Sequence, residues 1–384
     1  MNSKAYRAIL SLGIVSLFGD IVYESSRGLI PDYMKLLGAS AFVVGAATGA
    51  GELVGLTLRL VSGEIADRTR IYWGLTFLGY GLIIFIPLLA FSWCWQMAAI
   101  FVLAERLGKA IRSPARDVIL SVASRGIGSG RAFGIHEFLD QLGAILGPLI
   151  VTALMFFTGN YTLAFASLLC PFFLMLFFLV KARKYIGPLT TKGREKGNGG
   201  MGGRFLIYTL AMTINTVAIF PAPLILFKAA LISGGEKWIA PLLYTTIQLA
   251  DAPSALLAGI AYDRVGAKIL LLPFALSTVS SLLAVVSGDL ILLTCTAILF
   301  GVVLGMQESI YRSAVADLTP LSGRGRAYGI FNTAYGVAIL LASVIFGAFI
   351  DLKIPLATAS VYIVVAQVVA IALLIKALGK RSSE

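Results

Sequence analysis

The sequence contains few of the residues on which water-soluble proteins and metalloenzymes depend. Charged residues make up only 13% of the 384-residue chain, whereas an average soluble domain has roughly 25%. There is a single histidine, and the three cysteines are scattered at Cys94, Cys170 and Cys295. This set excludes the usual zinc sites and a disulfide framework, and leaves only carboxylate sites for hard cations. We therefore expect no bound metal.

Catalytic motifs are missing as well. The sequence has no H-E-x-x-H pair, no G-x-S-x-G nucleophile elbow, no phosphate-cradling glycine loop and no Ser or Cys suitably paired with His. We expect a protein that is not an enzyme and has no cofactor. The first residues also lack the small-residue cleavage site of a secretory signal peptide, so the first apolar segment is expected to stay in the protein.

Apolar surface is what the sequence has in excess. Hydrophobic residues make up 58% of the chain, and the mean hydropathy is +0.91. A membrane-spanning helix needs roughly 20 apolar residues, which leaves room for twelve spans joined by short loops. The sequence therefore predicts an all-α membrane protein with twelve transmembrane helices. The apolar runs are 7–34, 41–64, 71–92, 96–120, 131–157, 161–181, 205–229, 237–262, 268–287, 289–316, 325–350 and 355–378.

Two short motifs occur twice at nearly the same offset. The loop Gly63–Arg68 returns 196 residues later as Gly259–Arg264, and the motif Gly130–Ile135 returns 195 residues later as Gly325–Ile330. Two matches at nearly one spacing indicate a duplicated unit, and a six-plus-six duplicated membrane protein places its working site near the midplane. We expect a six-helix bundle at 1–180, a basic linker at 181–204 and a second six-helix bundle at 205–384.

The positive charges indicate the orientation. The net charge of +12 would suit a nucleic-acid partner, but the surplus Lys and Arg lie in loops on one side of the predicted membrane, as the positive-inside rule requires. We expect a monomer in the cell membrane with both termini and the linker in the cytoplasm. Its expected partners are the lipid bilayer and a small-molecule substrate, without nucleic acid.

With these motifs the chain resembles a transporter of the major facilitator superfamily over essentially its whole length. The loop at Gly63, Asp67 and Arg68 is similar to the signature between the second and third spans, and Asp263 and Arg264 match its second copy. The resemblance implies the fold of that superfamily, with two pseudo-symmetric bundles, in a prokaryotic protein.

A second match concerns the fifth span. Gly134, Gly143, Gly147 and Pro148 follow the spacing of the fifth-span signature associated with antiporters, although the usual glycine pair after the proline is absent. This resemblance implies proton-coupled antiport or efflux.

Charged residues within the spans are the functional candidates, because a charge at bilayer depth costs about 2.5–3.5 kcal/mol on insertion scales. Asp20, Glu24 and Arg27 recur at i, i+4 and i+7, which places them on one helix face. Carboxyls in such a cavity can bind and release a proton; permanent ion pairs between helices are the alternative. The candidates for substrate contact or proton coupling are Asp20, Glu24, Arg27, Glu52, Arg106, Glu137 and Glu308.

A second group of candidates lies near the predicted cytoplasmic surface. An ion pair of Asp67 with Arg112 or Arg116 could latch the inner gate, and the resemblance implies that Asp67 helps to hold the outward-facing state. Solvation of the loop is the alternative. The predicted gating residues are Gly63, Asp67, Arg68, Arg112, Arg116, Asp263 and Arg264.

Together these features predict a secondary active transporter that works by alternating access. The favoured hypothesis is proton-coupled efflux of a small amphipathic organic compound, driven by the proton gradient. Arg27, Arg59, Arg106 and Lys109 favour an alternative, transport of a specific anionic metabolite. A lipid translocase on the same scaffold is the remaining alternative.

Overall fold

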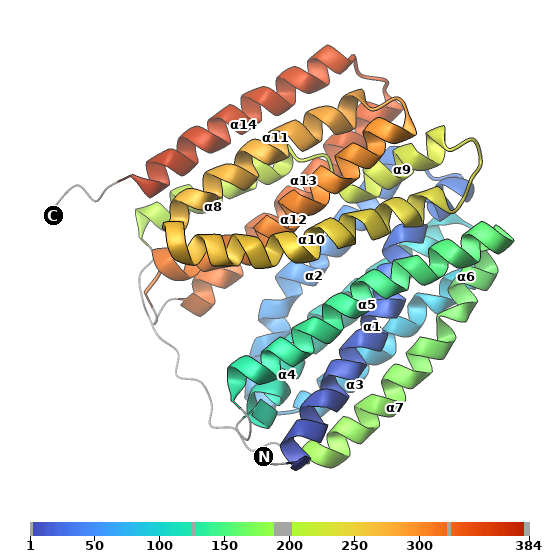
Figure 1. The fold of residues 1–384 in the computed structure, drawn as a ribbon, viewed down its shortest axis with the longest axis vertical. Helices are drawn as coiled ribbons and strands as arrows, with labels where there is room; N and C mark the ends of the chain where they lie inside the picture. Colours follow the sequence, from blue (N-terminus) through green and yellow to red (C-terminus); the bar gives the residue numbers. More distant parts are fainter. Residues whose placement is uncertain (1–2, 125–127, 188–201, 321–323, 380–384) are drawn as a thin grey trace. The chain divides into compact units, whose positions relative to one another are not determined.

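The computed structural model describes residues 3–124, 128–187, 202–320 and 324–379, and every regular element within them is helical (Figure 1). Most of the predicted linker, residues 188–201, lies outside the described residues. The first half comprises α1 (Ser3–Leu36), α2 (Ala41–Thr69), α3 (Tyr72–Gly81), η1 (Leu82–Phe85), η2 (Pro87–Phe91), α4 (Trp95–Ala123), α5 (Ser129–Thr158), α6 (Tyr161–Ser167) and α7 (Leu169–Ile186). The second half comprises α8 (Gly203–Val217), α9 (Ala222–Ile232), α10 (Ile239–Val265), η4 (Gly266–Leu270), α11 (Leu271–Val286), α12 (Leu290–Leu318), α13 (Arg324–Asp351) and α14 (Leu356–Leu378).

Ten helical segments among the described residues are long and apolar enough to cross a membrane. One of them, Ile239–Val286, contains both α10 and α11, which are separated by a turn at Gly266, where φ is +74°. Helix α4 is not among the ten; its middle carries four charges, at Glu105, Arg106, Lys109 and Arg112. The count of twelve spans therefore stays a prediction.

Proline interrupts the predicted seventh span. Helix α8 ends at Val217, and α9 begins after Pro221. The backbone nitrogen of a proline carries no hydrogen, so it cannot donate the hydrogen bond that would continue a helix. The predicted seventh span is therefore built from two helices. The predicted third span is not a single α-helix either: α3 is followed by the two 3-10 helices η1 and η2.

The chain divides into two compact units. Unit 1 comprises Met1–Gly38, Ala50–Arg194 and Glu236–Thr245, and unit 2 comprises Ala39–Gly49, Glu195–Gly235 and Thr246–Glu384. The start of α2 thus belongs to unit 2, and the start of α10 belongs to unit 1.

Within unit 1, α1 packs along α5 and α7. Two glycines of the fifth-span motif make this approach possible: a Cβ added at Gly143 would lie 2.4 Å from the carbonyl oxygen of Leu17, and one at Gly147 would lie 2.7 Å from that of Ile21. Side chains at these positions would push the two helices apart. The motif therefore has a packing role here.

Within unit 2, α12 approaches α10 closely in the same way. A Cβ at Gly301 would lie 2.3 Å from the carbonyl oxygen of Ile247, and one at Gly305 would lie 2.3 Å from that of Asp251. The first turn of α2 is also held in this unit, because the Asp351 carboxylate accepts hydrogen bonds from the backbone N–H groups of residues 41 (3.0 Å) and 42 (2.9 Å).

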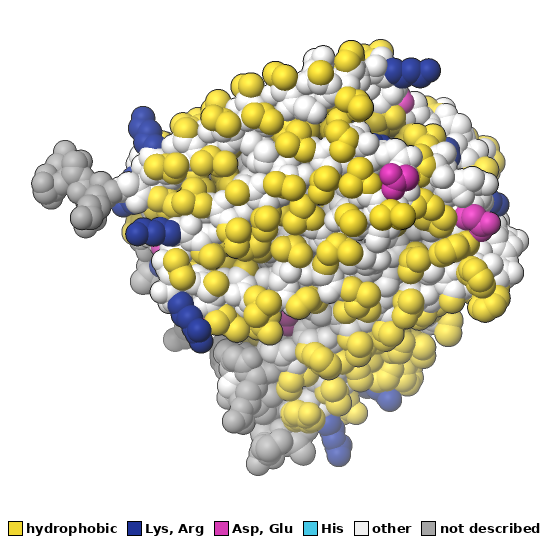
Figure 2. All heavy atoms as spheres, turned by 45° about the horizontal axis from the view of Figure 1, so that its top comes forward, with side chains coloured by type: hydrophobic (Ala, Val, Ile, Leu, Met, Phe, Trp, Pro, Cys, Tyr) yellow, Lys and Arg dark blue, Asp and Glu magenta, His cyan; other side chains and the backbone are white. Residues whose placement is uncertain are grey.

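The surface suits a lipid environment. Figure 2 shows hydrophobic side chains spread over the visible face, among which few charged side chains lie. Several of the largest are almost fully exposed, including Trp93 (78%), Phe157 (82%) and Ile291 (80%). Apolar exposure on this scale is characteristic of a membrane surface.

Candidate functional site

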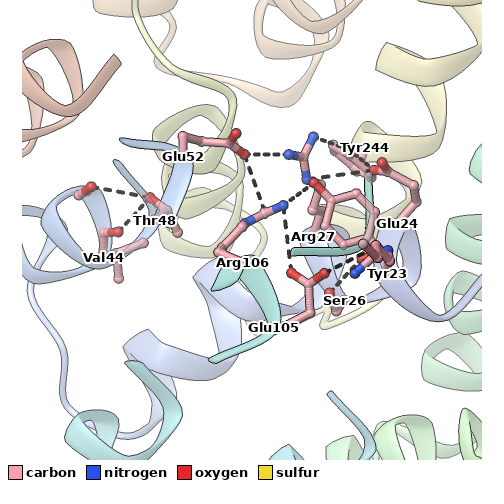
Figure 3. Close-up of polar contacts among 12 residues, drawn as sticks. Tyr23, Glu24, Ser26, Arg27, Val44, Thr48, Glu52, Glu105, Arg106 and Tyr244 are labelled. Atoms are coloured by element: carbon pink, nitrogen blue, oxygen red, sulfur yellow. Dashed lines mark hydrogen bonds and ion pairs between the residues drawn. The ribbon is translucent and has the colours of Figure 1, made fainter. Parts of the chain in front are cut away.

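A cluster of charged and aromatic side chains occupies the interior of unit 1 (Figure 3). Its members come from α1, α2, α4 and the first turns of α10. Ion pairs link its arginines and glutamates, and its lysine lies over an aromatic ring. We call it the Tyr23 cluster. It consists of Tyr23, Glu24, Arg27, Glu52, Glu105, Arg106, Lys109 and Tyr244.

Arg27 connects the helices of this cluster. Its guanidinium lies 3.8 Å from the Glu24 carboxylate on its own helix and also forms an ion pair with Glu52 of α2. The hydroxyl of Tyr244 donates to Glu24, and Arg27 Nη1 donates to that hydroxyl at 3.5 Å. The α1 face that the sequence predicted is therefore bound to two other helices.

Arg106 of α4 makes the second set of ion pairs. Its Nη2 atom lies 3.4 Å from Glu52 Oε1, and its Nη1 atom lies 3.8 Å from Glu105. Glu105 is 1% exposed and Arg106 is 6% exposed, so water contributes little to either charge. The structure thus brings together four predicted coupling residues from three helices: Glu24, Arg27, Glu52 and Arg106.

The ring of Tyr23 is the centre around which the cations gather. The guanidinium carbons of Arg27 and Arg106 lie 4.7 Å and 4.6 Å from its centroid, and Lys109 Nζ lies 3.9 Å from it. Arg106 also donates to the Tyr23 hydroxyl. Cations are attracted to the face of an aromatic ring. Sequence reasoning missed Tyr23, because an aromatic residue beside a charged one has no distinctive pattern.

Asp20, the remaining candidate on α1, lies outside this cluster and meets α5. The Ser16 hydroxyl, one turn before Asp20, donates to the Asp140 carboxyl. A Cβ on Gly143, about one turn after Asp140, would lie 3.1 Å from the Asp20 Cβ, so Asp20 and Asp140 are neighbours across the two helices. His136, one turn before Asp140 on α5, is 4% exposed, and its Nε2 atom has no hydrogen-bond partner among the described residues.

Two predicted coupling residues lie apart from these groups. Glu137 is exposed although its neighbour His136 is buried, because one residue turns the helix face by about 100°. Glu308 of α12 is also exposed, whereas Gln307 beside it is buried. Neither glutamate belongs to the Tyr23 cluster.

The predicted latch between Asp67 and α4 is not formed in the described structure. Arg112 Nη2 lies 3.6 Å from Glu105, on the buried side of α4, and Arg116 Nη2 lies 2.9 Å from its neighbour Asp117. Asp67 instead accepts a hydrogen bond from the Tyr72 hydroxyl at 3.3 Å. The arginines satisfy carboxylates of their own helix, which are nearer in sequence.

The other predicted gating residues have ordinary local contacts. At Gly63 an added Cβ would lie 3.6 Å from the Pro114 side chain, which is an ordinary contact distance, so the packing of α2 on α4 does not require glycine there. Arg68 forms an exposed ion pair with Glu64 at 2.7 Å. In the second copy, Asp263 and Arg264 are exposed near the end of α10.

Comparison with known proteins assigns the chain to a family. A family model described as Major Facilitator Superfamily matches residues 204–383. An uncharacterised MFS-type transporter of Methanocaldococcus jannaschii is 27% identical over 350 residues, which cover 88% of this chain and 86% of that protein. An uncharacterised protein of Mycobacterium tuberculosis is 35% identical over 365 residues, covering 91% and 88%. This chain belongs to the major facilitator superfamily.

Solved structures share the fold of this superfamily member. The nucleoside transporter NupG matches with a TM-score of 0.73 at 14% identity, covering 99% of this chain and 100% of that chain. The peptide transporter POT, in complex with sulfate, matches with a TM-score of 0.74 at 14% identity, covering 97% and 93%. The protein is therefore a multi-pass membrane protein with a transporter fold.

The half of this superfamily member that matches the family model has a different buried polar network, which we call the Asn215 network. The Asn215 amide donates to Ser277 at 2.8 Å and to Gln367 at 2.7 Å, and it accepts from the Tyr311 hydroxyl at 2.9 Å. None of its groups is charged. Its members are Asn215, Ser277, Gln307, Tyr311, Tyr335 and Gln367.

Proposed function

We propose that this superfamily member is a proton-coupled secondary transporter of a small organic anion, working by alternating access. The observation that carries the proposal is Lys109. It lies over the Tyr23 ring beside Arg27 and Arg106, and it has no carboxylate within ion-pair distance in the described part of the chain.

The charges around Tyr23 do not balance. Arg27 is paired with Glu24 and Glu52, Arg106 with Glu52 and Glu105, and Arg112 with Glu105. Three carboxylates therefore serve four cations, and Lys109 is the surplus one. A partly buried cation without a carboxylate partner is unfavourable, so an anionic substrate group near Lys109 would offset that cost.

This balance changes the order of the two hypotheses drawn from the sequence. Efflux of an amphipathic cation would bring a positive charge to a region that already has one positive charge too many. An anion would instead be attracted by this excess positive charge, and two neighbouring guanidinium groups can bind carboxylate or phosphate oxygens. The geometry therefore supports the anionic metabolite better than the amphipathic compound.

The remaining features of the proposal come from the charge pattern and the duplication. We place twelve spans in two six-helix bundles, 1–180 and 205–384, with the basic linker and both termini in the cytoplasm of the cell. The positive-inside rule supports this orientation. The protein acts as a transporter without a cofactor, driven by the proton gradient.

Purified protein in proteoliposomes tests the proposal. With an inward proton gradient, we expect uptake of at least one anion from a panel of radiolabelled carboxylates and phosphate esters, and no uptake of cationic dyes. The variant Lys109→Gln should abolish anion uptake. The matched control is Lys228→Gln, because Lys228 is also half-buried but donates to the carbonyls of Ala284 and Val285.

Two results would contradict the proposal. One is dye transport that depends on the proton gradient while every anion fails. The other is anion uptake that survives Lys109→Gln unchanged.

A further inference from the structure

We infer that Asp20 and Asp140 together form the proton-binding site, as a carboxyl pair that holds one proton between α1 and α5. This inference rests on the proposed function, since it names the site at which that transporter binds its coupling ion. Asp140 was not among the coupling residues that the sequence predicted, and the pair makes the site a property of two helices rather than of Asp20 alone.

The geometry favours a shared proton. The Ser16 contact and the close approach at Gly143 hold the Asp20 and Asp140 carboxyls next to each other between α1 and α5. Two carboxylates that share one site repel each other, so one of them keeps its proton. The packing keeps the pair together, because a Cβ on Gly143 would lie 3.1 Å from the Asp20 Cβ. The two helices cannot separate the carboxyls without losing this close approach.

The surroundings assign the proton to Asp20. Asp140 accepts a hydrogen bond from the Ser16 hydroxyl, a contact that suits an ionised carboxylate because such a group can only accept. Asp20 has the Glu24 carboxylate one turn further along its own helix, and two like charges at that spacing are unfavourable. The other titratable groups that act on the pair are Arg116 and Lys109 of α4, His136 of α5 and Tyr80 of α3.

The second half of the chain provides a natural comparison. Asn215 lies 195 residues after Asp20, and Tyr335 lies 195 residues after Asp140, which is the offset between the two copies of the Gly130–Ile135 motif. An amide cannot take up and release a proton, and a phenol keeps its proton near neutral pH. The protonatable pair is therefore present in the first copy and replaced in the second.

The pair is linked electrostatically to the Tyr23 cluster through Lys109. The positive charge of Lys109 acts on the Asp20 carboxyl, and an anion bound at Lys109 would cancel that interaction. Binding of the anion should then strengthen proton binding, and by linkage the proton should strengthen anion binding to the same degree. Cooperative binding of this kind makes the two travel in the same direction, as symport.

Infrared difference spectroscopy of the purified protein tests the pair without a substrate. At neutral pH we expect a protonated-carboxyl band that disappears in Asp20→Asn and that is shifted or lost in Asp140→Asn. Asp20→Glu keeps a carboxyl and should retain the band, which guards against a general loss of folding. Asp32→Asn is the control: Asp32 is also a half-buried α1 aspartate, but its partner is the neutral hydroxyl of Tyr161.

A band that is unchanged in either Asp20→Asn or Asp140→Asn would overturn the inference. The result is separate from the proposed function. Should the band behave as expected while no anion is transported, the proton pair stands and the substrate assignment fails. Should anion uptake be proton-driven while Asp140→Asn leaves both the band and the uptake intact, the transporter stands and the pair fails.

Discussion

The Tyr23 cluster and the Asn215 network are both buried polar networks, but they solve the problem of burial differently. In the Asn215 network neutral amides and hydroxyls satisfy one another at hydrogen-bond distances of 2.7–3.3 Å. In the Tyr23 cluster, charges share partners: Glu52 serves both Arg27 and Arg106. A satisfied neutral network specifies one packing, whereas charges with shared partners can exchange them. This difference supports the proposal that the first half of the chain carries the coupling chemistry.

Among substitutions that test the difference between the two networks, Arg106→Met should have the largest effect on stability and transport. The substitution leaves Glu105 buried beside Arg112 alone and removes one of the two arginines paired with Glu52. Breaking a buried ion pair typically costs about 3–5 kcal/mol, so we expect a large fall in the melting temperature in detergent and loss of transport. Arg68→Met removes an exposed ion pair and should change stability by less than about 1 kcal/mol. Equal effects of the two substitutions would contradict the contrast.

A smaller effect is expected from Asn215→Leu. It removes the acceptor of the Tyr311 hydroxyl and the donor to Ser277 and Gln367, and a buried polar group without a partner costs about 1–3 kcal/mol. Thermal unfolding should show this loss, while the infrared band of the Asp20 and Asp140 pair should be unchanged. Loss of that band would show that proton binding depends on the second half as well.

Substitutions of Tyr23 should distinguish the contribution of its aromatic ring from that of its hydroxyl. Tyr23→Phe keeps the ring that faces Arg27, Arg106 and Lys109 and loses one hydrogen bond. Tyr23→Leu removes the cation–π contacts as well, each worth about 0.5–2 kcal/mol. We expect Tyr23→Leu to lower the unfolding free energy and anion affinity more than Tyr23→Phe does. Indistinguishable variants would mean that the ring has no part in holding the cations.

The smallest effect is expected at Asp351. Its carboxylate accepts hydrogen bonds from two N–H groups in the first turn of α2. A negative charge there also interacts favourably with the helix dipole, and such an interaction contributes about 0.3–1 kcal/mol. Asp351→Asn should therefore lower the melting temperature slightly and the effect should weaken in high salt. An unchanged melting temperature at low salt would show that this contact adds nothing to the stability of unit 2.

The sequence predicted much of the fold, because membrane helices are recognisable from apolar length alone and the duplication shows in two motifs. It also named Glu24, Arg27, Glu52 and Arg106 among seven candidates, since buried charges need partners, and the structure places these four together. Asp20, Glu24 and Arg27 were predicted to share one helix face, but they contact different helices. Asp20 lies against α5, Arg27 pairs with Glu52 of α2, and Glu24 accepts from Tyr244 of α10.

Other features depend on the register between helices that are far apart in sequence. The pairing of Asp20 with Asp140 joins residues on two helices, and helical periodicity within one segment says nothing about it. Tyr244 belongs to the second half by sequence but packs in unit 1, so no boundary drawn along the chain could assign it. Arg112 was expected near Asp67 from loop position, but the nearer buried carboxylate of Glu105 holds it.

The most direct measurement of the central claim is proton movement during anion uptake. Proteoliposomes loaded with a pH-sensitive dye should acidify when an outside anion of the panel enters, and Asp20→Asn should abolish that acidification while Asp32→Asn leaves it intact. Acidification that persists in Asp20→Asn, or alkalinisation of the lumen when the anion enters, would contradict proton symport through the first half of the chain.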